Sequence, residues 1–525
     1  MGRRFKVAGS ADQGFLMPPD PREWLPPRHL AWALLELAGK LDLSGFEGRY
    51  RPDGKGRPAY HPAMMVTLVM YCYCKGIRSS RGIEMATFDD VGARVICGNL
   101  HPDHATIARF AIVNERPLKG LLAQSVAACA REGLVSVDVV AGDGTKVKAS
   151  ASMAANVTAA DLDAAIAALQ ELIEAETAAW VAEHLAADEA DGEHRGQGPQ
   201  AAGRPGGGQG RKRTAHTLAR RQAARAELQA GAAARDARAR ERQQQRAGRL
   251  AERAAVQQEK ADRLFAAADR KFRAWQDRAA ACAPGRLPSG RQPIDPDQNR
   301  DVRQARAVAA RLRERAAQAA AATPDGSGRE LKVNLTDPAS RVMPLKKGGY
   351  DQLFNVQALA VRRQVIIAIS RHDSPDDTGA LHPLLAQGRA VLDAAGITAP
   401  IGKALWDAGY ASDANFTAAC EPDLYVAVTR ESRQAGRRRD GREPATMKPS
   451  WQQMTARLST PEGKALYKQR AAIIEPVFAQ LFARLGRHLN YRGDRTDLEL
   501  HLFAASHNML KAIRARQHSP APATA

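Results

Sequence analysis

The clearest helix signal in the chain is the stretch Lys468-Gln-Arg-Ala-Ala-Ile-Ile-Glu-Pro-Val-Phe-Ala-Gln480, which carries a single carboxylate, Glu475. Beside that acid runs an apolar stripe with the three- and four-residue spacing by which a helix packs onto a core. Its members are Ile474, Val477, Phe478, Leu481 and Leu485. The pattern predicts a helix that covers a core and holds one acid at its edge.

Two other acids stand where an apolar, strand-like run meets a glycine. Asp143 lies in Val139-Val-Ala-Gly-Asp-Gly-Thr145, and Asp407 lies in Ala404-Leu-Trp-Asp-Ala-Gly-Tyr410. Strand ends that run into glycine expose side chains for chemistry. Two acids on strand ends and one on a covering helix could together hold two divalent metal ions.

The composition favours a polyanionic partner. The chain has 525 residues, a formal net charge of +20, a sequence pI of about 10.0 and 44% hydrophobic residues, enough for two or three domains with a sizeable core. Nucleic acid is the first candidate partner, because phosphate neutralisation supplies most non-specific affinity. The alternative is that a GC-rich genome inflates the Arg and Ala content.

The cysteines and the apolar segments point to a reducing, cytoplasmic setting. No paired spacing suggests a zinc site, and the two cysteines in an apolar helical run look like buried thiols. We expect no signal peptide and no membrane partner, because no apolar run approaches the ~20 residues that span a bilayer. The cysteines are Cys72, Cys74, Cys97, Cys129, Cys282 and Cys420.

Residues 1–133 form the first predicted domain, which is helical beyond an irregular start at 1–20. Within it, 77–83 and 102–110 each place a polar capping residue ahead of an apolar, basic helix. Such helices could present their N-termini and arginines to DNA phosphates, as helix-turn-helix modules do. An ordinary helical domain with solvated arginines fits equally well. The candidate DNA contacts here are Arg78, Arg81 and Arg109.

A catalytic core interrupted by an insertion follows. Alternating β-branched residues predict a strand at 134–141 that ends at Gly142-Asp143-Gly144, within a first core segment at 134–157. Residues 158–322 are rich in Ala and Arg and predict long helices, extended or partly disordered. Their arginines could follow a nucleic-acid backbone, although a solvated charged helix is at least as consistent with the composition.

The rest of the core is predicted at 323–515, with a disordered tail at 516–525. The patterns indicate a hairpin, a helix, a short strand, another strand, a basic loop and then the helix that carries Glu475. The fold class is therefore α/β, a mixed sheet interrupted by a long helical insertion and preceded by an all-helical domain. The elements are 354–361 with 364–370, 381–395, 402–406, 423–429 and 430–448.

The three acids suit phosphodiester chemistry. Two Mg²⁺ (or Mn²⁺) ions about 3.5–4 Å apart serve both ends of an in-line displacement, and few carboxylates suffice to hold them. Asp143 would bridge the ions, with Asp407 on one and Glu475 on the other. Taken singly, each acid also has a plainer explanation: a turn residue, a helix cap and a solvated helix acid.

Several motifs together resemble the DDE transposases of bacterial insertion sequences. The N-terminal pieces resemble the helical domain that precedes the core in one branch of that family. The match extends over nearly the whole chain apart from the insertion. The motifs are Asp143-Gly-Thr-Lys146, Gly349-Tyr-Asp-Gln-Leu-Phe-Asn-Val-Gln357, Asp407-Ala-Gly-Tyr410, Tyr467-Lys-Gln-Arg-Ala-Ala-Ile-Ile-Glu-Pro-Val-Phe478, His507-Asn-Met-Leu-Lys511, Gly56-Arg-Pro-Ala-Tyr-His-Pro-Ala-Met-Met65, Gly76-Ile-Arg-Ser-Ser-Arg81 and Pro102-Asp-His-Ala-Thr-Ile-Ala-Arg-Phe110.

The resemblance implies an RNase H-like core that cuts DNA at transposon ends and joins the 3′ hydroxyl to a target. It assigns the catalytic acids to Asp143, Asp407 and Glu475, and it implies DNA contacts by Tyr467 and Arg470. Lys146 and Arg484 are further candidate DNA contacts. The chain departs from the family pattern at two positions. Relatives often carry a Lys one to two helical turns after the catalytic Glu, whereas the next basic residue here is Arg484. Phe354 replaces the Tyr that usually precedes Asn-Val-Gln.

Helical geometry tests part of this expectation. At 100° per residue, Tyr467 lies about 80° and Arg470 about 140° from Glu475 around one straight helix. Such a helix would not aim both at one phosphate, so Pro476 is expected to kink or restart it.

Three functions share these features: an active transposase, a DNA-binding protein with a decayed site, and a nuclease without strand transfer. Cutting at paired ends would call for at least a homodimer.

Overall fold

The chain forms two compact units, which we treat separately. The core unit comprises residues 1–155 and 336–525, and the helical unit comprises residues 156–335. The computed structural model describes residues 23–48, 59–193, 208–282, 286–322, 331–345, 348–428 and 449–518. Two predicted segments, the irregular start at 1–20 and the basic loop at 430–448, lie outside these described residues.

One mixed sheet, six-stranded in the described residues, forms the centre of the core unit. β1 (Val139–Lys148) runs antiparallel to β5 (Tyr350–Val361) on one side and parallel to β7 (Lys403–Trp406) on the other. β8 (Asp423–Val426) continues the parallel part, and two antiparallel strands pair with β5. These are β4 (Arg341–Pro344) and β6 (Ile366–His372). The mixed α/β class and the β5–β6 hairpin are confirmed.

β1 differs from the sequence prediction, because it does not end at the glycines. The strand runs unbroken through Gly142, Asp143 and Gly144, so Asp143 lies in mid-strand rather than at a strand end. Both glycines are needed for packing. A Cβ on Gly142 would lie 2.1 Å from the ring of Trp406, and one on Gly144 would lie 2.4 Å from Nε2 of Gln357.

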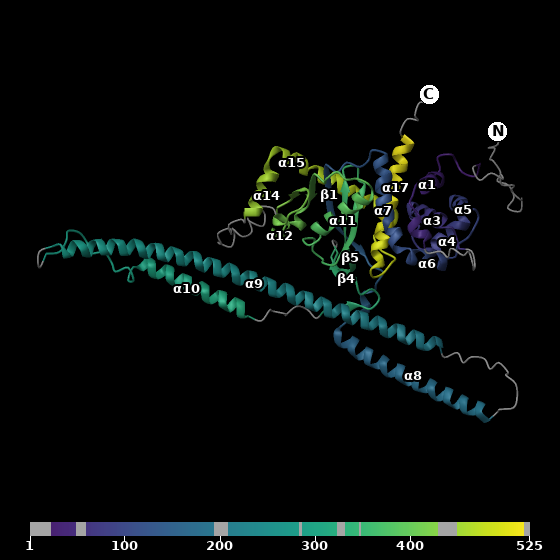
Figure 1. Cartoon of the computed structure of the whole chain (residues 1–525), viewed down its shortest axis with the longest axis horizontal. Helices are drawn as coiled ribbons and strands as arrows, with labels where there is room; N and C mark the ends of the chain where they lie inside the picture. Colours follow the sequence, from purple (N-terminus) through teal and green to yellow (C-terminus); the bar gives the residue numbers. More distant parts are fainter. Residues whose placement is uncertain are drawn as a thin grey trace, which may run out of the picture. The chain divides into compact units, whose positions relative to one another are not determined.

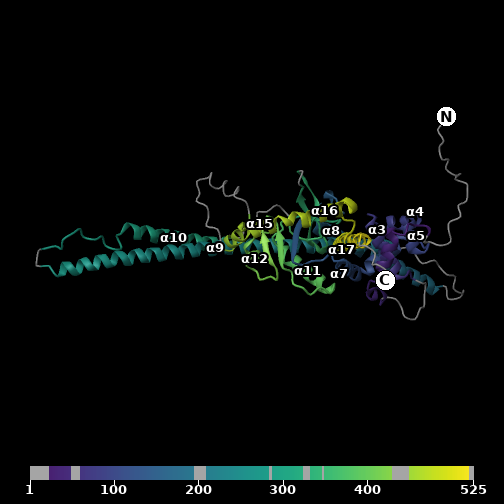
Figure 2. The same cartoon turned by 90° about the horizontal axis from the view of Figure 1, so that it is seen from above.

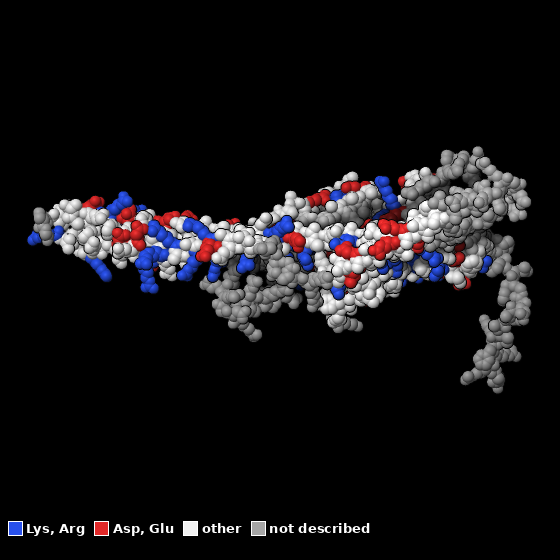
Figure 3. Space-filling model, turned by 90° about the horizontal axis from the view of Figure 1, so that it is seen from below, with Lys and Arg blue, Asp and Glu red and all other residues white. Residues whose placement is uncertain are grey.

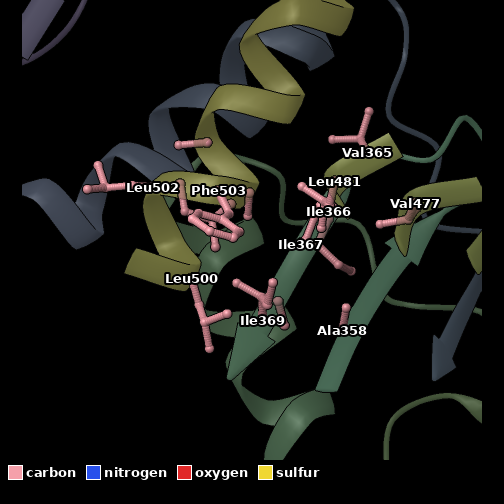
Figure 4. Packing of buried hydrophobic residues seen from close by; sticks show 14 of the residues in the cluster. Ala358, Val365, Ile366, Ile367, Ile369, Val477, Leu481, Leu500, Leu502 and Phe503 are labelled. Atoms are coloured by element: carbon pink, nitrogen blue, oxygen red, sulfur yellow. The ribbon is translucent and has the colours of Figure 1, made fainter. Parts of the chain in front are cut away.

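Two C-terminal helices bury their apolar faces on this sheet. α16 (Gln469–Leu485) packs on β1 and β5, and α17 (Arg495–His518) packs on β6. Figure 4 shows Val477 and Leu481 of α16, with Leu500 and Phe503 of α17, in one cluster with strand residues. Each such side chain contributes about 1.5–3 kcal/mol when it is fully buried. α17 continues to His518, so the tail predicted to be disordered from residue 516 begins as helix.

The N-terminal part of the core unit is helical in its described residues, as predicted. α3 has capping signals at its start, where His61 accepts from the Ala63 N–H and Pro62 occupies the first turn. α17 contacts both α3 and α7, which ties this part to the sheet (Figure 1). The helices are α1 (Leu30–Ala38), α2 (Ser44–Glu47), α3 (Pro62–Cys74), α4 (Ser80–Asp89), α5 (Val91–Cys97), α6 (His104–Val113) and α7 (Glu115–Arg131).

Shorter helices complete the core unit. α11 follows the β5–β6 hairpin and packs on both of its strands. α14 and α15 precede α16, and α12 packs on α14. Cys72, Cys74, Cys97 and Cys129 are buried free thiols. The bounds are α11 (Leu381–Ala394), α12 (Asp413–Thr417), α14 (Pro449–Ser459) and α15 (Pro461–Tyr467).

In its described residues, the helical unit contains three helices. A two-stranded antiparallel pair joins the beginning and the end of the unit. α9 (Gly208–Ala280) is 73 residues long, and both α8 (Ala159–Glu193) and α10 (Arg300–Ala321) pack along it, as Figure 1 and Figure 2 show. β2 (Asn156–Val157) pairs antiparallel with β3 (Val333–Asn334). The segment predicted as an extended or partly disordered insertion is therefore helical wherever these three helices run. No helix among the described residues combines the length and apolarity needed to cross a bilayer.

Candidate active site

The central parallel strands bring Asp143 and Asp407 together. Ala141 pairs with Leu405 across β1 and β7, so the two acids stand at equivalent positions two residues further along. Asp407 directly follows β7, and its Oδ1 accepts the N–H of Gly409 at 2.8 Å, which caps the turn at Ala408–Tyr410. Asp143 Oδ1 accepts the N–H of Gly144 at 2.8 Å. Local backbone bonds thus orient both carboxylates.

Arg470 joins the third acid to this pair. Its guanidinium lies 3.5 Å from Oδ2 of Asp143 through Nη1 and 4.0 Å from Oε1 of Glu475 through Nη2. The Arg470 side chain is 15% exposed, whereas that of Glu475 is 63% exposed. The guanidinium therefore bridges a half-buried acid on β1 and a solvated acid on α16.

Burial controls the protonation of Asp143. Burial raises the pKa of Asp143 above its usual value, although the attraction of Arg470 and the Gly144 N–H oppose this shift. The charge of Asp407 adds to the rise in pKa, which places Asp407 within electrostatic reach. A buried carboxylate whose charge is only partly compensated is a common feature of functional sites.

Tyr467 lies beside Arg470, on a different helix from Glu475. It is the last residue of α15, and α16 begins at Gln469, with Lys468 as the shared cap. The break expected at Pro476 therefore falls at Lys468, and Pro476 lies inside α16. Burial raises the pKa of Tyr467, while the charge of Arg470 and a hydrogen bond with it oppose the rise. Because Tyr467 and Glu475 belong to two helices separated at Lys468, the angle worked out for one straight helix does not apply to Tyr467.

A fourth acid, Asp377, also borders this site. Its Oδ1 accepts hydrogen bonds from Asn355 Nδ2 at 2.8 Å and Gln357 Nε2 at 2.7 Å. A Cβ built on Gly409 would lie 3.2 Å from Asp377 Oδ2 and 3.0 Å from Asp407 Oδ1, so both carboxylates border that glycine. The sequence analysis missed Asp377. The signal that could have found it is the paired acid in Ser374-Pro-Asp-Asp377, directly after a predicted strand.

An amide network fixes Asp377 to the sheet. Alternation along β5 places Asn355 and Gln357 on one face, opposite Lys146 and Gly144 of β1. The hydroxyl of Tyr410 donates to Gln357 Oε1, and Gln357 Nε2 also donates to Asn355 Oδ1 at 3.0 Å. Lys146, a predicted DNA contact, donates to the carbonyl of Pro375 at 2.5 Å and so holds the loop that carries Asp377.

The other predicted DNA contacts lie in two places. The first place is where the 76–78 segment meets the 484–488 segment. Arg78 lies beside Gly486, and the backbone of Arg484 lies beside Gly76. Arg78 is 8% exposed and donates to His488 O at 2.7 Å and to buried Glu499 at 3.1 Å, so its charge is used internally. Burial lowers the pKa of Arg484, which is half-buried. Arg81 and Arg109 are exposed, on the mutually packed helices α4 and α6.

The donor chemistry of the acids fits a hard divalent cation, since all are carboxylates. In the described residues, however, no three His, Cys, Asp or Glu side chains converge on one point as a closed metal site. The positive charge between Asp143 and Glu475 is that of Arg470. A cation shared by these two acids therefore requires the guanidinium to withdraw.

Two family models match the chain, one towards each end. Residues 19–111 match the family described as Transposase domain (DUF772), and residues 429–513 match Transposase DDE domain. The second match includes Glu475 and Arg470, whereas Asp143 and Asp407 lie outside both. No curated protein and no solved structure matches the chain. Transposase families imply a DNA substrate and, for the DDE class, a general dependence on divalent metal ions. The two matches support placing this chain among the DDE transposases of insertion sequences.

Proposed function

We propose that this protein is a transposase that cuts DNA at the ends of its insertion sequence and transfers the freed 3′ hydroxyl to target DNA. The observation that carries the proposal is the arrangement around Arg470. Acids from two neighbouring parallel strands and from the covering helix α16 meet there, and that helix lies within the DDE family match.

Asp143, Asp407 and Glu475 are the residues that would hold two Mg²⁺ or Mn²⁺ ions. The ions would supply activation of the attacking hydroxyl and stabilisation of the departing oxygen. Because burial raises its pKa, Asp143 must lose its proton against a desolvation cost, and a nearby cation favours that loss. Glu475 is exposed and can approach a cation by rotation of its side chain.

Arg470 and Tyr467 act on the DNA side of the site. Without DNA, the guanidinium of Arg470 offsets the charge of Asp143 and is poised near Glu475. In the DNA complex the guanidinium would bind a phosphate oxygen of the cleaved strand, a pairing that arginine geometry suits. Tyr467, which interacts with Arg470, would contact the same DNA strand.

The N-terminal helices would position the DNA. Arg81 on α4 and Arg109 on α6 are exposed, and each helix has a capped N-terminus that can face a phosphate. Two ends must be held together during transposition, so the active complex is expected to contain at least a homodimer.

The test is cleavage and joining of a labelled duplex that carries the element's own end, with Mg²⁺ or Mn²⁺. The natural protein should cut and join. Asp143→Ala, Asp407→Ala and Glu475→Ala should each abolish chemistry and still bind DNA. Asp373→Ala, at an acid that is 76% exposed, is the matched control and should remain active. DNA binding without any cleavage would support a decayed site instead, and cleavage without joining would support a nuclease.

A further inference from the structure

Helix α9 carries a row of arginines along one side. Arg238, Arg242, Arg246, Arg249 and Arg253 follow one another at steps of four, four, three and four residues. At 100° per residue, these steps keep all five within an arc of about 80°. We refer to these five residues as the arginine row. Lys260 falls on the same line.

The charges of the arginine row are free. All five side chains are exposed, and within the described part of the chain none is ion-paired with a carboxylate. Arg242 and Arg249 donate only to backbone carbonyls of the preceding turn, at 3.3 and 3.2 Å. The nearest acids on the helix, Glu241 and Glu252, point about 80–100° away from the centre of the row.

Packing against α10 keeps the row in a fixed place. The buried positions of this part of α9, Ala254 and Ala261, lie about 100–120° round the helix from the row. Arg313 of α10 donates to Gln258 at 2.9 Å on that packed side. The row is therefore a straight line of charge about 22 Å long, at 1.5 Å per residue, on a braced helix. In Figure 3, Lys and Arg side chains lie on the surface of this helical unit, interspersed with Asp and Glu.

The neighbouring helix α8 has the opposite character. It contains Asp and Glu but neither Lys nor Arg, and it packs on the earlier part of α9. There Arg225 makes a bidentate salt bridge with Asp163, with hydrogen bonds of 2.7 and 3.1 Å. Arg221 donates to the carbonyl of Ala165. Arg225 is thus neutralised by an acid of α8, whereas no arginine of the row is ion-paired among the described residues.

We propose that the arginine row binds the phosphate backbone of duplex DNA. Duplex DNA carries one negative charge per ~1.7 Å of its axis, so a straight line of cations meets phosphates along its whole length. The stretch from Arg238 to Arg253 has no aromatic residue, and its one Leu, Leu250, lies about 80° round the helix from the centre of the row, so no apolar stripe of the kind that anchors an amphipathic helix in a membrane accompanies the arginines. The inference rests on the proposed function, since DNA is the substrate considered.

The test is the salt dependence of binding between the full-length protein and a duplex of random sequence. Arg242→Gln/Arg246→Gln removes two charges from the row. Arg240→Gln/Arg273→Gln removes two exposed charges from the same helix at about 140–160° from the row and is the control for net charge, with Arg240 free of an ion pair among the described residues and Arg273 paired with Asp269 at 2.9 Å. Because each lost phosphate contact reduces the slope of log K against log salt by about 0.9, the row variant should lose about 2 and the control should lose nothing.

Equal losses of slope in both variants, or none in the row variant, would overturn the inference. A polyglutamate peptide of matched charge that displaces the protein from DNA as well as competing duplex does would also overturn it, because the row would then bind any polyanion. Failure here is separable from failure of the proposed function. A row variant that keeps its slope while the natural protein still cuts and joins element ends refutes only the inference. A lowered slope in a protein that never cuts DNA refutes only the transposase activity.

Discussion

At the residue scale, Asp143 and Arg470 form a pair in which neither charge is fully satisfied. The two are 3.5 Å apart, longer than a direct hydrogen bond, and Arg470 is shared with Glu475. Burial nonetheless raises the pKa of Asp143, so the pair does not offset the desolvation of the carboxylate. An ionised carboxylate in these surroundings therefore costs the folded state stability.

Asp143→Asn should therefore stabilise the folded protein at pH 7. When folding raises the pKa of a carboxyl group, its protonated form adds to the free energy of unfolding. That contribution is complete below the unfolded-state pKa of 3.8, and it is lost as the pH rises through the folded-state pKa. Removing the charge should yield about 0.5–2 kcal/mol at pH 7, the usual gain from relieving a costly functional group. The gain should shrink as pH falls towards 4. Thermal unfolding measured at several pH values checks this, with Asp373→Asn as control. A destabilised Asp143→Asn at pH 7 would show that the attraction of Arg470 dominates.

Asp377→Asn should impair chemistry but not DNA binding. Asp377 borders Gly409 together with Asp407 and accepts two amide hydrogen bonds, so it orients the site rather than the DNA. Loss of a group that supports metal ligands typically costs 10–100-fold, and we expect roughly a 10-fold slower cleavage with a higher metal requirement.

Titration of Mg²⁺ in the cleavage assay measures this second effect, which a purely structural role would not produce. Asp373→Asn, four residues earlier and exposed, should leave both quantities unchanged. An Asp377→Asn protein with an unaltered rate and metal titration would exclude Asp377 from the site.

At the scale of elements, a buried ion pair fastens the N-terminal helices to the sheet. Arg78, just before α4, pairs with Glu499 of α17 at 3.1 Å. Glu499 is fully buried, and its second oxygen accepts the N–H groups of Asn490 and Tyr491 at 2.7 and 3.0 Å. Three segments therefore meet at one carboxylate, with Arg78 on one oxygen and two backbone N–H groups on the other.

Arg78→Met should destabilise the core unit by about 3–5 kcal/mol, because Glu499 would be left buried without its counter-charge. Arg78→Met with Glu499→Gln should recover part of that loss. Chemical denaturation of the single and double variants gives the coupling between them. Arg81→Met, three residues on and exposed, should change stability by no more than about 0.5 kcal/mol. An Arg78→Met protein as stable as the natural one would mean that Arg78 is available to DNA after all.

At the scale of the whole molecule, the two units have separate hydrophobic cores. The large cluster around the sheet contains no residue between 156 and 335. The helical unit has its own small cluster of Leu162, Ala224, Leu228 and Val333. The chain enters and leaves the helical unit through the β2–β3 ladder, whose antiparallel pairing holds the two crossing points a strand's width apart.

Replacing residues 156–335 with a four-residue Gly/Ser turn should leave the core unit folded. Because no side chain of its core is lost, its unfolding midpoint should stay within about 4 °C, the shift that roughly 1 kcal/mol produces in a domain of 150–250 residues. Calorimetry and far-UV circular dichroism measure the midpoint and the lost helix. The shortened protein should also bind random duplex with a weaker salt dependence. Loss of cooperative unfolding would show that the core needs the inserted helices.

Elements whose signals are local could be predicted from the sequence. The β5–β6 hairpin follows from two β-branched runs, α11 follows from apolar spacing, and the long helices of the insertion follow from Ala-rich composition. Each pattern is set by neighbours within a few residues, so no distant partner is needed to recognise it. The candidate acids Asp143, Asp407 and Glu475 were also identified in this way, from strand and helix patterns.

Only the tertiary structure decided what those residues meet. The glycines beside Asp143 resembled a strand end, yet they exist because Trp406 and Gln357 pack against the strand from positions more than 200 residues away. Arg78 was predicted as a DNA contact from its helix, but its ion pair with Glu499 could be seen only in the fold, and Asp377 became a candidate only through Gly409. The sequence by itself determined the elements and the kinds of chemistry they carry. The partners of each charge depend on chain segments far apart in sequence, so burial and pairing emerged only from the fold.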